Sequence, residues 1–149
     1  MKAYEFKVAT AQQLRETDTV LADTPGGIWQ YFKASIETAD YWDPMKEHFV
    51  VVFLNTRRRV TGHSLVSIGQ LDQCLASPRE VFRPAIVAAA QAIVLVHNHP
   101  SGDPTPSEAD IRITRDLIRA GQLLKIEIID HVIAGETYKS LRELGFFYS

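Results

Sequence analysis

The sequence predicts one main domain of the mixed α/β (α+β) class. Strand-like runs rich in β-branched and aromatic residues, such as 47–55 and 93–96, alternate with segments whose apolar residues recur at helical spacing, such as 28–36 and 107–121. The 149 residues, of which 46% are apolar and 23% charged, are enough for one well-buried core and too few for two domains of usual size. We therefore expect a single core built from strands and helices.

The overall composition excludes several classes of protein. Lys and Arg number 16 against 18 Asp and Glu, so the net charge of −2 supplies no field that would attract nucleic acid or an anionic membrane. The single Cys74 allows no internal disulfide. No stretch of about eighteen apolar residues predicts a membrane span, and the first residues show no secretory signal. These features predict a cytoplasmic protein without a membrane or nucleic-acid partner.

The N-terminal stretch 1–44 is expected to be an extension packed on a main domain formed by residues 45–149. Loose alternation over 2–8 favours an edge strand, and Thr10 is placed to cap a helix. The segment 28–36 has the spacing of an amphipathic helix. Its aromatic residues indicate packing in the core more than a binding surface, namely Trp29, Tyr31 and Phe32.

The next elements predict a hairpin and a helix. Residues 47–55 and 60–69 are strand-like and are separated by a turn, which indicates a β-hairpin. A helix is expected from Pro78 to Ala90, kinked or split at Pro84. Ser77 precedes Pro78 as an N-cap and Glu80 completes a capping box, so we expect Glu80 to have a structural role.

Two histidines follow a short β-branched and apolar run. Residues 93–96 read Ile-Val-Leu-Val, which indicates a strand buried on both faces. Side chains of an extended chain alternate between faces, so His97 and His99 point to one side and Asn98 to the other. Two adjacent neutral imidazoles suit a zinc ion.

A carboxylate lies a short loop away from these histidines. Residues 100–106 are too rich in Pro and Gly for regular structure, and Ser107 then fits the N-cap of a helix with Asp110 in its first turn. By itself this Ser-x-x-Asp pattern indicates only a capping box. Together with His97 and His99 it offers two nitrogens and one oxygen, and a catalytic zinc requires three protein ligands with a fourth position open for water.

The C-terminal third predicts a helix, an extended segment and a final short helix or turn. An apolar stripe that includes Leu123 continues the helix, with Gly121 near its end, and residues 124–135 are extended. Residues 138–145 are expected to form the short helix or turn. Asp130 and His131 allow two interpretations, a carboxylate that accepts the spare N–H of a zinc-bound imidazole or two residues packed in the sheet. Neither they nor His48 and His63 are expected to be ligands.

The central segment resembles a known family of zinc hydrolases. The spacing His97-x-His99, then seven residues, then Ser107-x-x-Asp110 is similar to the JAMM motif, also called JAB or MPN+, and HNHPSGDPTPSEAD resembles its bacterial RadC-like branch. The similarity extends from Glu47 to Gly135 and includes EHFVVVFLNTRRRV, SPREVFRPAI and IIDHVIAG.

This resemblance implies a JAMM/MPN-like (cytidine-deaminase-like) fold, a curved β-sheet flanked by helices. It implies one catalytic Zn²⁺ held by His97, His99 and Asp110. Glu47 would act as the general base on the bound water, and Ser107 would assist at the developing oxyanion.

The function implied is zinc-dependent hydrolysis of peptide or isopeptide bonds, with a peptide or protein as substrate. The alternatives are a catalytically inert JAMM-fold interaction module and a DNA-repair-associated protein of the RadC-like family. All five motif residues are present, which favours catalysis. Residues 1–44 do not resemble the helix-hairpin-helix region expected ahead of RadC-like domains, so DNA binding lacks its usual carrier. The substrate and the oligomeric state stay open.

Overall fold

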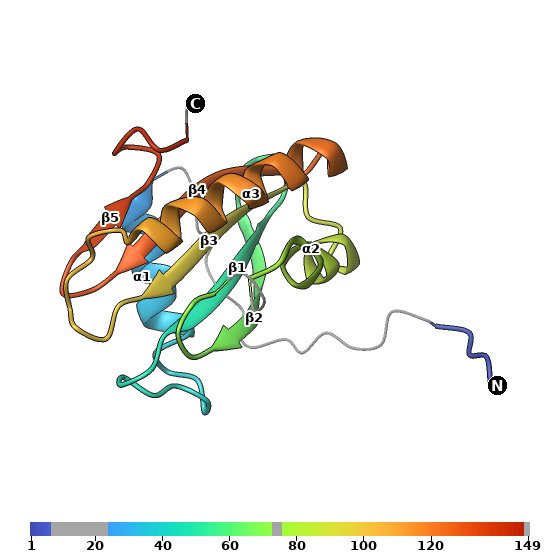
Figure 1. The fold of residues 1–149 in the computed structure, drawn as a ribbon, viewed down its shortest axis with the longest axis horizontal. Coiled ribbons are helices and arrows are strands. Elements are labelled where there is room, and N and C mark those ends of the chain that lie inside the picture. Colours follow the sequence, from blue (N-terminus) through green and yellow to red (C-terminus); the bar gives the residue numbers. More distant parts are fainter. Residues whose placement is uncertain (7–23, 73–75, 148–149) are drawn as a thin grey trace.

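The computed structural model describes residues 1–6, 24–72 and 76–147, which contain an open five-stranded sheet and three helices (Figure 1). The elements in chain order are α1 (Pro25–Ser35), β1 (His48–Leu54), β2 (Val60–Ile68), α2 (Pro78–Val87), β3 (Ala92–Asn98), α3 (Glu108–Leu124), β4 (Glu127–Ala134) and β5 (Tyr138–Ser140). The strand order is β2-β1-β3-β4-β5. Only β3 and β4 are parallel, and α3 connects them. Across the described residues, no helix combines the length and apolarity needed to cross a bilayer.

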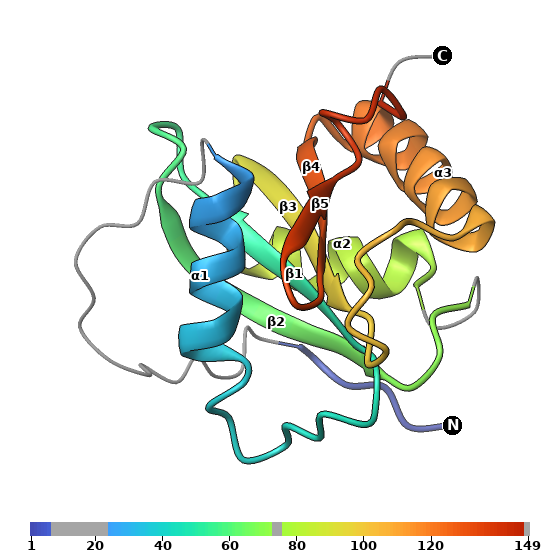
Figure 2. The same cartoon turned by 90° about the vertical axis from the view of Figure 1, so that its left-hand side faces the viewer.

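The sheet is buried on both faces, and this explains the uninterrupted apolar runs of β1 and β3. Odd-numbered side chains of these strands, such as Phe49 and Leu95, join a core with α2 and α3. Even-numbered side chains, such as Val50 and Val96, join a second core with α1. Figure 2 shows α1 on one side of the sheet and α2 and α3 on the other. The prediction of a strand buried on both faces is therefore confirmed.

Helix α1 covers one face of the sheet. Thr24 caps it by accepting the N–H of Gly27 at 3.1 Å, and Pro25 occupies the first turn. Ile28, Tyr31 and Phe32 are buried in the second core. Trp29 is partly buried and packs against this core. The predicted helix and the core role of its aromatic residues are confirmed.

Helix α2 begins as predicted but ends earlier. Ser77 accepts the N–H of Glu80, and the helix runs without interruption through Pro84 to Val87. Of the two expected outcomes at Pro84, a kink or a split, the split is wrong. Pro84 removes only one backbone donor, which would have bonded the Glu80 carbonyl, and the helix stops about one turn later. Ala89 then takes a positive φ of 53°, which turns the chain towards β3.

Helix α3 and the C-terminal segment differ from the prediction in three places. Gly121 lies inside α3, and Lys125, with φ 61°, ends the helix in the left-handed conformation. Leu124 is therefore helical, and Leu123 is 87% exposed and does not belong to the apolar stripe. Residues 138–140 form β5 against β4, and the turns begin only after it. Pairing with β4 overrides the helical spacing of this short segment.

The predicted elements of the N-terminus are only partly described. Residues 2–6 contain no regular structure, so the expected strand does not form there. The rest of that strand and the helix predicted at Thr10 lie outside the described residues.

Candidate metal centre

Strand β3 delivers the two histidines to one face of the sheet. His97 has an odd number and lies on the face covered by α3, where its side chain is fully buried. His99 follows the strand, and its N–H donates to the Ala134 carbonyl at 2.8 Å. Asn98 points to the opposite face, as the alternation predicts.

The loop after His99 is docked on the β4–β5 turn. Gly102 takes φ 88°, and its carbonyl accepts the N–H of Glu136 at 2.8 Å. A Cβ on Gly135 would lie 2.3 Å from that carbonyl oxygen, so only glycine allows this approach. The loop in turn places the carbonyl of Asp103 where it accepts the Nδ1–H of His99 at 2.9 Å. Asp103 therefore fixes the ring of His99 with Nε2 facing the centre.

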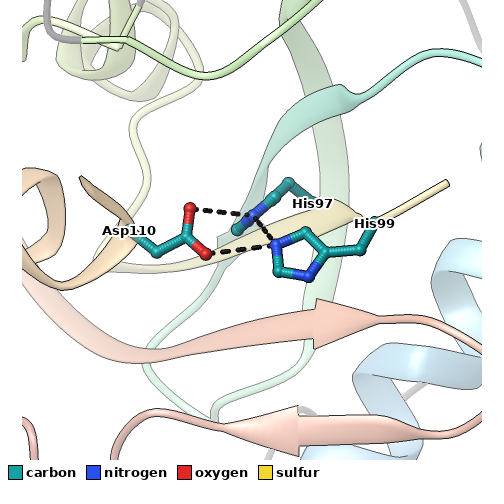
Figure 3. Close-up of side chains that lie close together, drawn as sticks. All are labelled: His97, His99 and Asp110. Atoms are coloured by element: carbon teal, nitrogen blue, oxygen red, sulfur yellow. Dashed lines mark hydrogen bonds and ion pairs between the residues drawn. The ribbon is translucent and has the colours of Figure 1, made fainter. Parts of the chain in front are cut away.

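Asp110 is held by the start of α3. Its Oδ2 accepts the N–H of Ser107 at 2.9 Å, and the Ser107 hydroxyl oxygen accepts the N–H of Asp110 at 3.0 Å. This is the capping box that the sequence predicts. The same carboxylate that completes the capping box also faces His97 and His99 (Figure 3).

The three side chains converge tightly. His97 Nε2 lies 3.1 Å from His99 Nε2 and 3.2 Å from Asp110 Oδ1, and His99 Nε2 lies 3.1 Å from Asp110 Oδ2. Ligands about 2.0–2.1 Å from a tetrahedral zinc are separated by about 3.4 Å, so small shifts would accommodate an ion. These residues form a group able to hold a metal ion.

The electrostatics of the centre favour a cation. Burial acts to raise the pKa of the Asp110 carboxyl, but its contacts with the imidazoles of His97 and His99 outweigh burial and hold the pKa well below its usual range. The pKa of His99 is raised, first by its hydrogen bond to Asp110, against a lowering by burial. Asp110 therefore stays ionised, and a positive charge is stabilised at this position.

The other two predicted site residues line a cavity of about 330 Å³ beside this group. Glu47 and Ser107 contribute to its wall together with His99 and Asp110. Glu47 Oε2 accepts the N–H of Leu71 at 2.8 Å, which holds the carboxylate in place. A larger hollow of about 440 Å³ lies beside the last turns of α3, and none of the five motif residues lines it.

The remaining acidic and histidine candidates lie elsewhere. Glu80 is exposed and pairs with Arg83 at 2.9 Å, in keeping with its predicted structural role. The ring of His48 packs on Trp42 with 4.4 Å between centroids. His63 Nδ1 lies 2.8 Å from the Tyr31 hydroxyl, which joins β2 to α1.

One partner of the centre was not recognised as such in the sequence. His131 Nε2 lies 2.7 Å from His97 Nδ1, and burial keeps the pKa of His131 well below its usual value. Asp130 points to the other face, where it accepts the Ser140 hydroxyl at 2.6 Å, so it does not bind a liganding imidazole. The Asp-His pair was a visible signal, but which of the two faces His97 depends on the strand pairing.

Comparisons with known proteins agree with this geometry. Residues 22–146 match the family described as RadC-like JAB domain, a longer stretch than the one noted in the sequence, and it includes α1. UPF0758 proteins are similar: 48% identical over 103 residues in Caldanaerobacter subterraneus, 54% over 101 in Desulfitobacterium hafniense and 44% over 102 in Methanosarcina mazei. These alignments cover 67–68% of this chain but only 44% of each relative, so the chain spans less than half of their length. The chain belongs to the RadC-like JAB domain family.

Proposed function

We propose that this domain is a zinc-dependent hydrolase that cleaves peptide or isopeptide bonds with an activated water. The observation that supports this proposal is one shared cavity wall. Two members of the group that could hold a metal, His99 and Asp110, line the same cavity as Glu47 and Ser107. A ligand set, a base and a hydrogen-bond donor are the parts that metal-assisted hydrolysis requires.

The ligand set suits zinc better than a harder cation. Two imidazole nitrogens and one carboxylate oxygen are typical of zinc, whereas Mg²⁺ and Ca²⁺ prefer oxygen ligands throughout. A zinc ion held by these three residues would keep a fourth position for water. Bound zinc would lower the pKa of a water in that position to about 7 and polarise a substrate carbonyl.

Glu47 is the proposed general base. The Leu71 N–H holds Oε2, and within the described part of the chain no donor binds Oε1. That oxygen can accept the proton of the attacking water and pass it to the leaving amine. Fixing one oxygen while the other stays available gives the proton transfer a defined geometry.

Ser107 is the proposed donor to the oxyanion. Its oxygen accepts the N–H of Asp110, which leaves the hydroxyl hydrogen without an acceptor among the described residues. The hydroxyl lies in the wall of the cavity, where a carbonyl oxygen of the substrate would develop negative charge. The same residue can therefore cap α3 and stabilise the transition state.

The test compares Glu47→Gln with the parent and with Glu80→Gln. All three proteins are loaded with zinc, their metal content is measured, and they are assayed against a library of peptide and isopeptide substrates. Glu47→Gln should keep its zinc and lose about 10²–10⁴ in rate, whereas Glu80→Gln should retain the parental rate. Parental cleavage by zinc-loaded Glu47→Gln would exclude this base. A parent that binds zinc and cleaves no substrate in the library would favour an inert interaction module.

A further inference from the structure

His131 lies behind His97, on the side away from the metal-binding group. Its side chain projects from β4 to the same face as His97 and is completely buried. His131 Nε2 approaches His97 Nδ1 to 2.7 Å, whereas it is the other ring nitrogen of His97, Nε2, that faces His99 and Asp110. His131 therefore contacts the ring of a proposed ligand without being placed to bind the metal itself.

We propose that Thr114 and His131 are positioning residues, which fix the tautomer of His97 so that its Nε2 presents a lone pair to the metal. This inference rests on the proposed metal-dependent function. It assigns a role to two residues that lie outside the five-residue motif.

The hydrogen-bond chain begins in α3 and has a determined direction. The Thr114 side chain lies 2.6 Å from the Asp110 carbonyl oxygen, and a carbonyl can only accept, so the hydroxyl hydrogen points there. Thr114 Oγ1 also lies 2.6 Å from His131 Nδ1. Because its single hydrogen is already used, Thr114 Oγ1 must accept at this contact, and His131 Nδ1 must carry a proton.

The direction carries over to His97. A neutral imidazole with a proton on Nδ1 has a lone pair on Nε2, so His131 Nε2 accepts a hydrogen bond from His97 Nδ1–H. His97 in turn keeps a lone pair on Nε2, which faces His99 Nε2 at 3.1 Å and Asp110 Oδ1 at 3.2 Å, so a proton on His99 Nε2 or a cation must join these atoms. The other tautomer of His97 would set two lone pairs against each other at the 2.7 Å contact and point an N–H at the metal position.

The three side chains of this hydrogen-bond chain are buried away from solvent. The side chains of His97, Thr114 and His131 have 0% exposure, and the ring of Phe49 packs against both histidines at 6.2 Å and 5.8 Å between centroids. Water from bulk solvent therefore cannot replace His131 as the acceptor. His99 differs, since it is fixed by the Asp103 carbonyl and its side chain is 14% exposed.

The arrangement also connects the ligands to one another. The carboxylate of Asp110 faces the centre, and its backbone carbonyl accepts the hydroxyl of Thr114. The hydrogen bonds through Thr114 and His131 therefore connect Asp110 to His97. Partners that orient a metal-bound imidazole in this way typically contribute 10–100-fold in metal affinity.

The first experiment is a zinc competition titration of variants of the 149-residue chain. His131→Phe keeps a ring but removes the acceptor, and Thr114→Val keeps the shape but removes the hydroxyl. We expect both to bind zinc 10–100-fold more weakly than the parent. His131→Gln, whose amide oxygen can accept from His97, and Thr114→Ser, which keeps the hydroxyl, should recover part or all of the affinity.

The matched control is Asp130→Asn. Asp130 is buried next to His131 on the same strand but faces Ser140, so its replacement should lower stability and leave zinc affinity unchanged. Parental zinc affinity in folded His131→Phe and Thr114→Val would overturn the proposal. So would an equal loss of affinity in Asp130→Asn, because the effect would then be general destabilisation.

The second experiment reads the tautomer directly in the metal-free parent. Long-range ¹H–¹⁵N NMR spectra should show His97 with its proton on Nδ1 and an unprotonated Nε2, and a proton on Nε2 of neutral His97 would overturn the proposal. This measurement needs no variant to fold. It also separates the two ideas, since a parent that binds no zinc would defeat the proposed function while the spectrum still decides the tautomer.

Discussion

Asn98 holds the backbone on both sides of Glu47. Its Nδ2 donates to the Lys46 carbonyl at 2.9 Å, and its Oδ1 accepts the N–H of His48 at 2.7 Å. The residue between the two histidines of the motif thus anchors the start of β1, from which the proposed base projects. The position of Glu47 relative to His97, His99 and Asp110 is therefore coupled to β3 itself.

Replacing Asn98 by Ala should reduce hydrolysis without removing the metal. The Lys46 carbonyl and the His48 N–H would lose their buried partner, which costs about 1–3 kcal/mol of stability. Glu47 would then be free to shift, and a displacement of about 1 Å can cost about 10²-fold in rate. Zinc content and turnover per folded molecule measure the two effects separately. An unchanged rate in the zinc-loaded variant would show that Glu47 does not depend on this anchor.

Removing either histidine ligand should abolish stoichiometric zinc binding. His97→Ala and His99→Ala should each hold well below one zinc per chain, and zinc should no longer raise their thermal stability, because binding to the native state adds to the free energy of unfolding. His63→Ala is the control, since His63 contacts Tyr31 and lies apart from the centre. Elemental analysis and thermal unfolding with and without zinc provide the measurements. Full zinc in both ligand variants would refute the ligand assignment.

Ser107→Ala should affect both stability and rate. Loss of the N-cap should cost about 1 kcal/mol, and loss of the hydroxyl donor should lower the rate by about 10²–10³ while zinc stays bound. Ser77→Ala removes the cap of α2 in the same way and should lower stability alone. Denaturant unfolding and turnover are compared for the two variants. Equal rates in both would reduce Ser107 to a helix cap.

Zinc binding should weaken as the pH falls. The pKa of His99 in the metal-free protein is raised above its usual 6.5, chiefly by the hydrogen bond to Asp110, so a proton stays on His99 at higher pH than on a free imidazole. Zinc must displace that proton, and the apparent affinity should drop about tenfold per unit below the raised pKa. Calorimetric titrations in buffers of different ionisation enthalpy would report the released proton. An affinity independent of pH between about 5 and 8 would contradict this coupling.

Local patterns predicted most of the centre. The alternation along β3 predicted that His97 and His99 share a face, and the cap signal at Ser107 predicted where α3 begins. Both depend only on residues close in sequence, where backbone geometry allows few alternatives. The same locality explains why α1 and the β1–β2 hairpin were predicted well.

Features that depend on distant residues were not predicted. His131 faces the centre because the parallel pairing of β3 with β4 places it opposite Leu95, diagonally next to His97, and this register joins residues more than thirty positions apart in the sequence. The end of α3 at Lys125 was missed because Gly121, a usual terminator, is needed inside the helix: a Cβ there would lie 2.5 Å from the Ile126 carbonyl oxygen. In both cases tertiary contact overrides the local signal.

Strand β3 carries His97 on one face and Asn98 on the other, so the positions of both residues depend on a single strand register. A slip of one residue in the pairing of β3 with β1 would turn Asn98 towards α3 and both imidazoles towards α1, so the ligands and the anchor of Glu47 would be lost together. It would also exchange the apolar side chains between the two cores, which ties a misregistered centre to a misfolded sheet. A sheet formed in the observed register therefore carries both imidazoles on the face covered by α3, where Asp110 meets them.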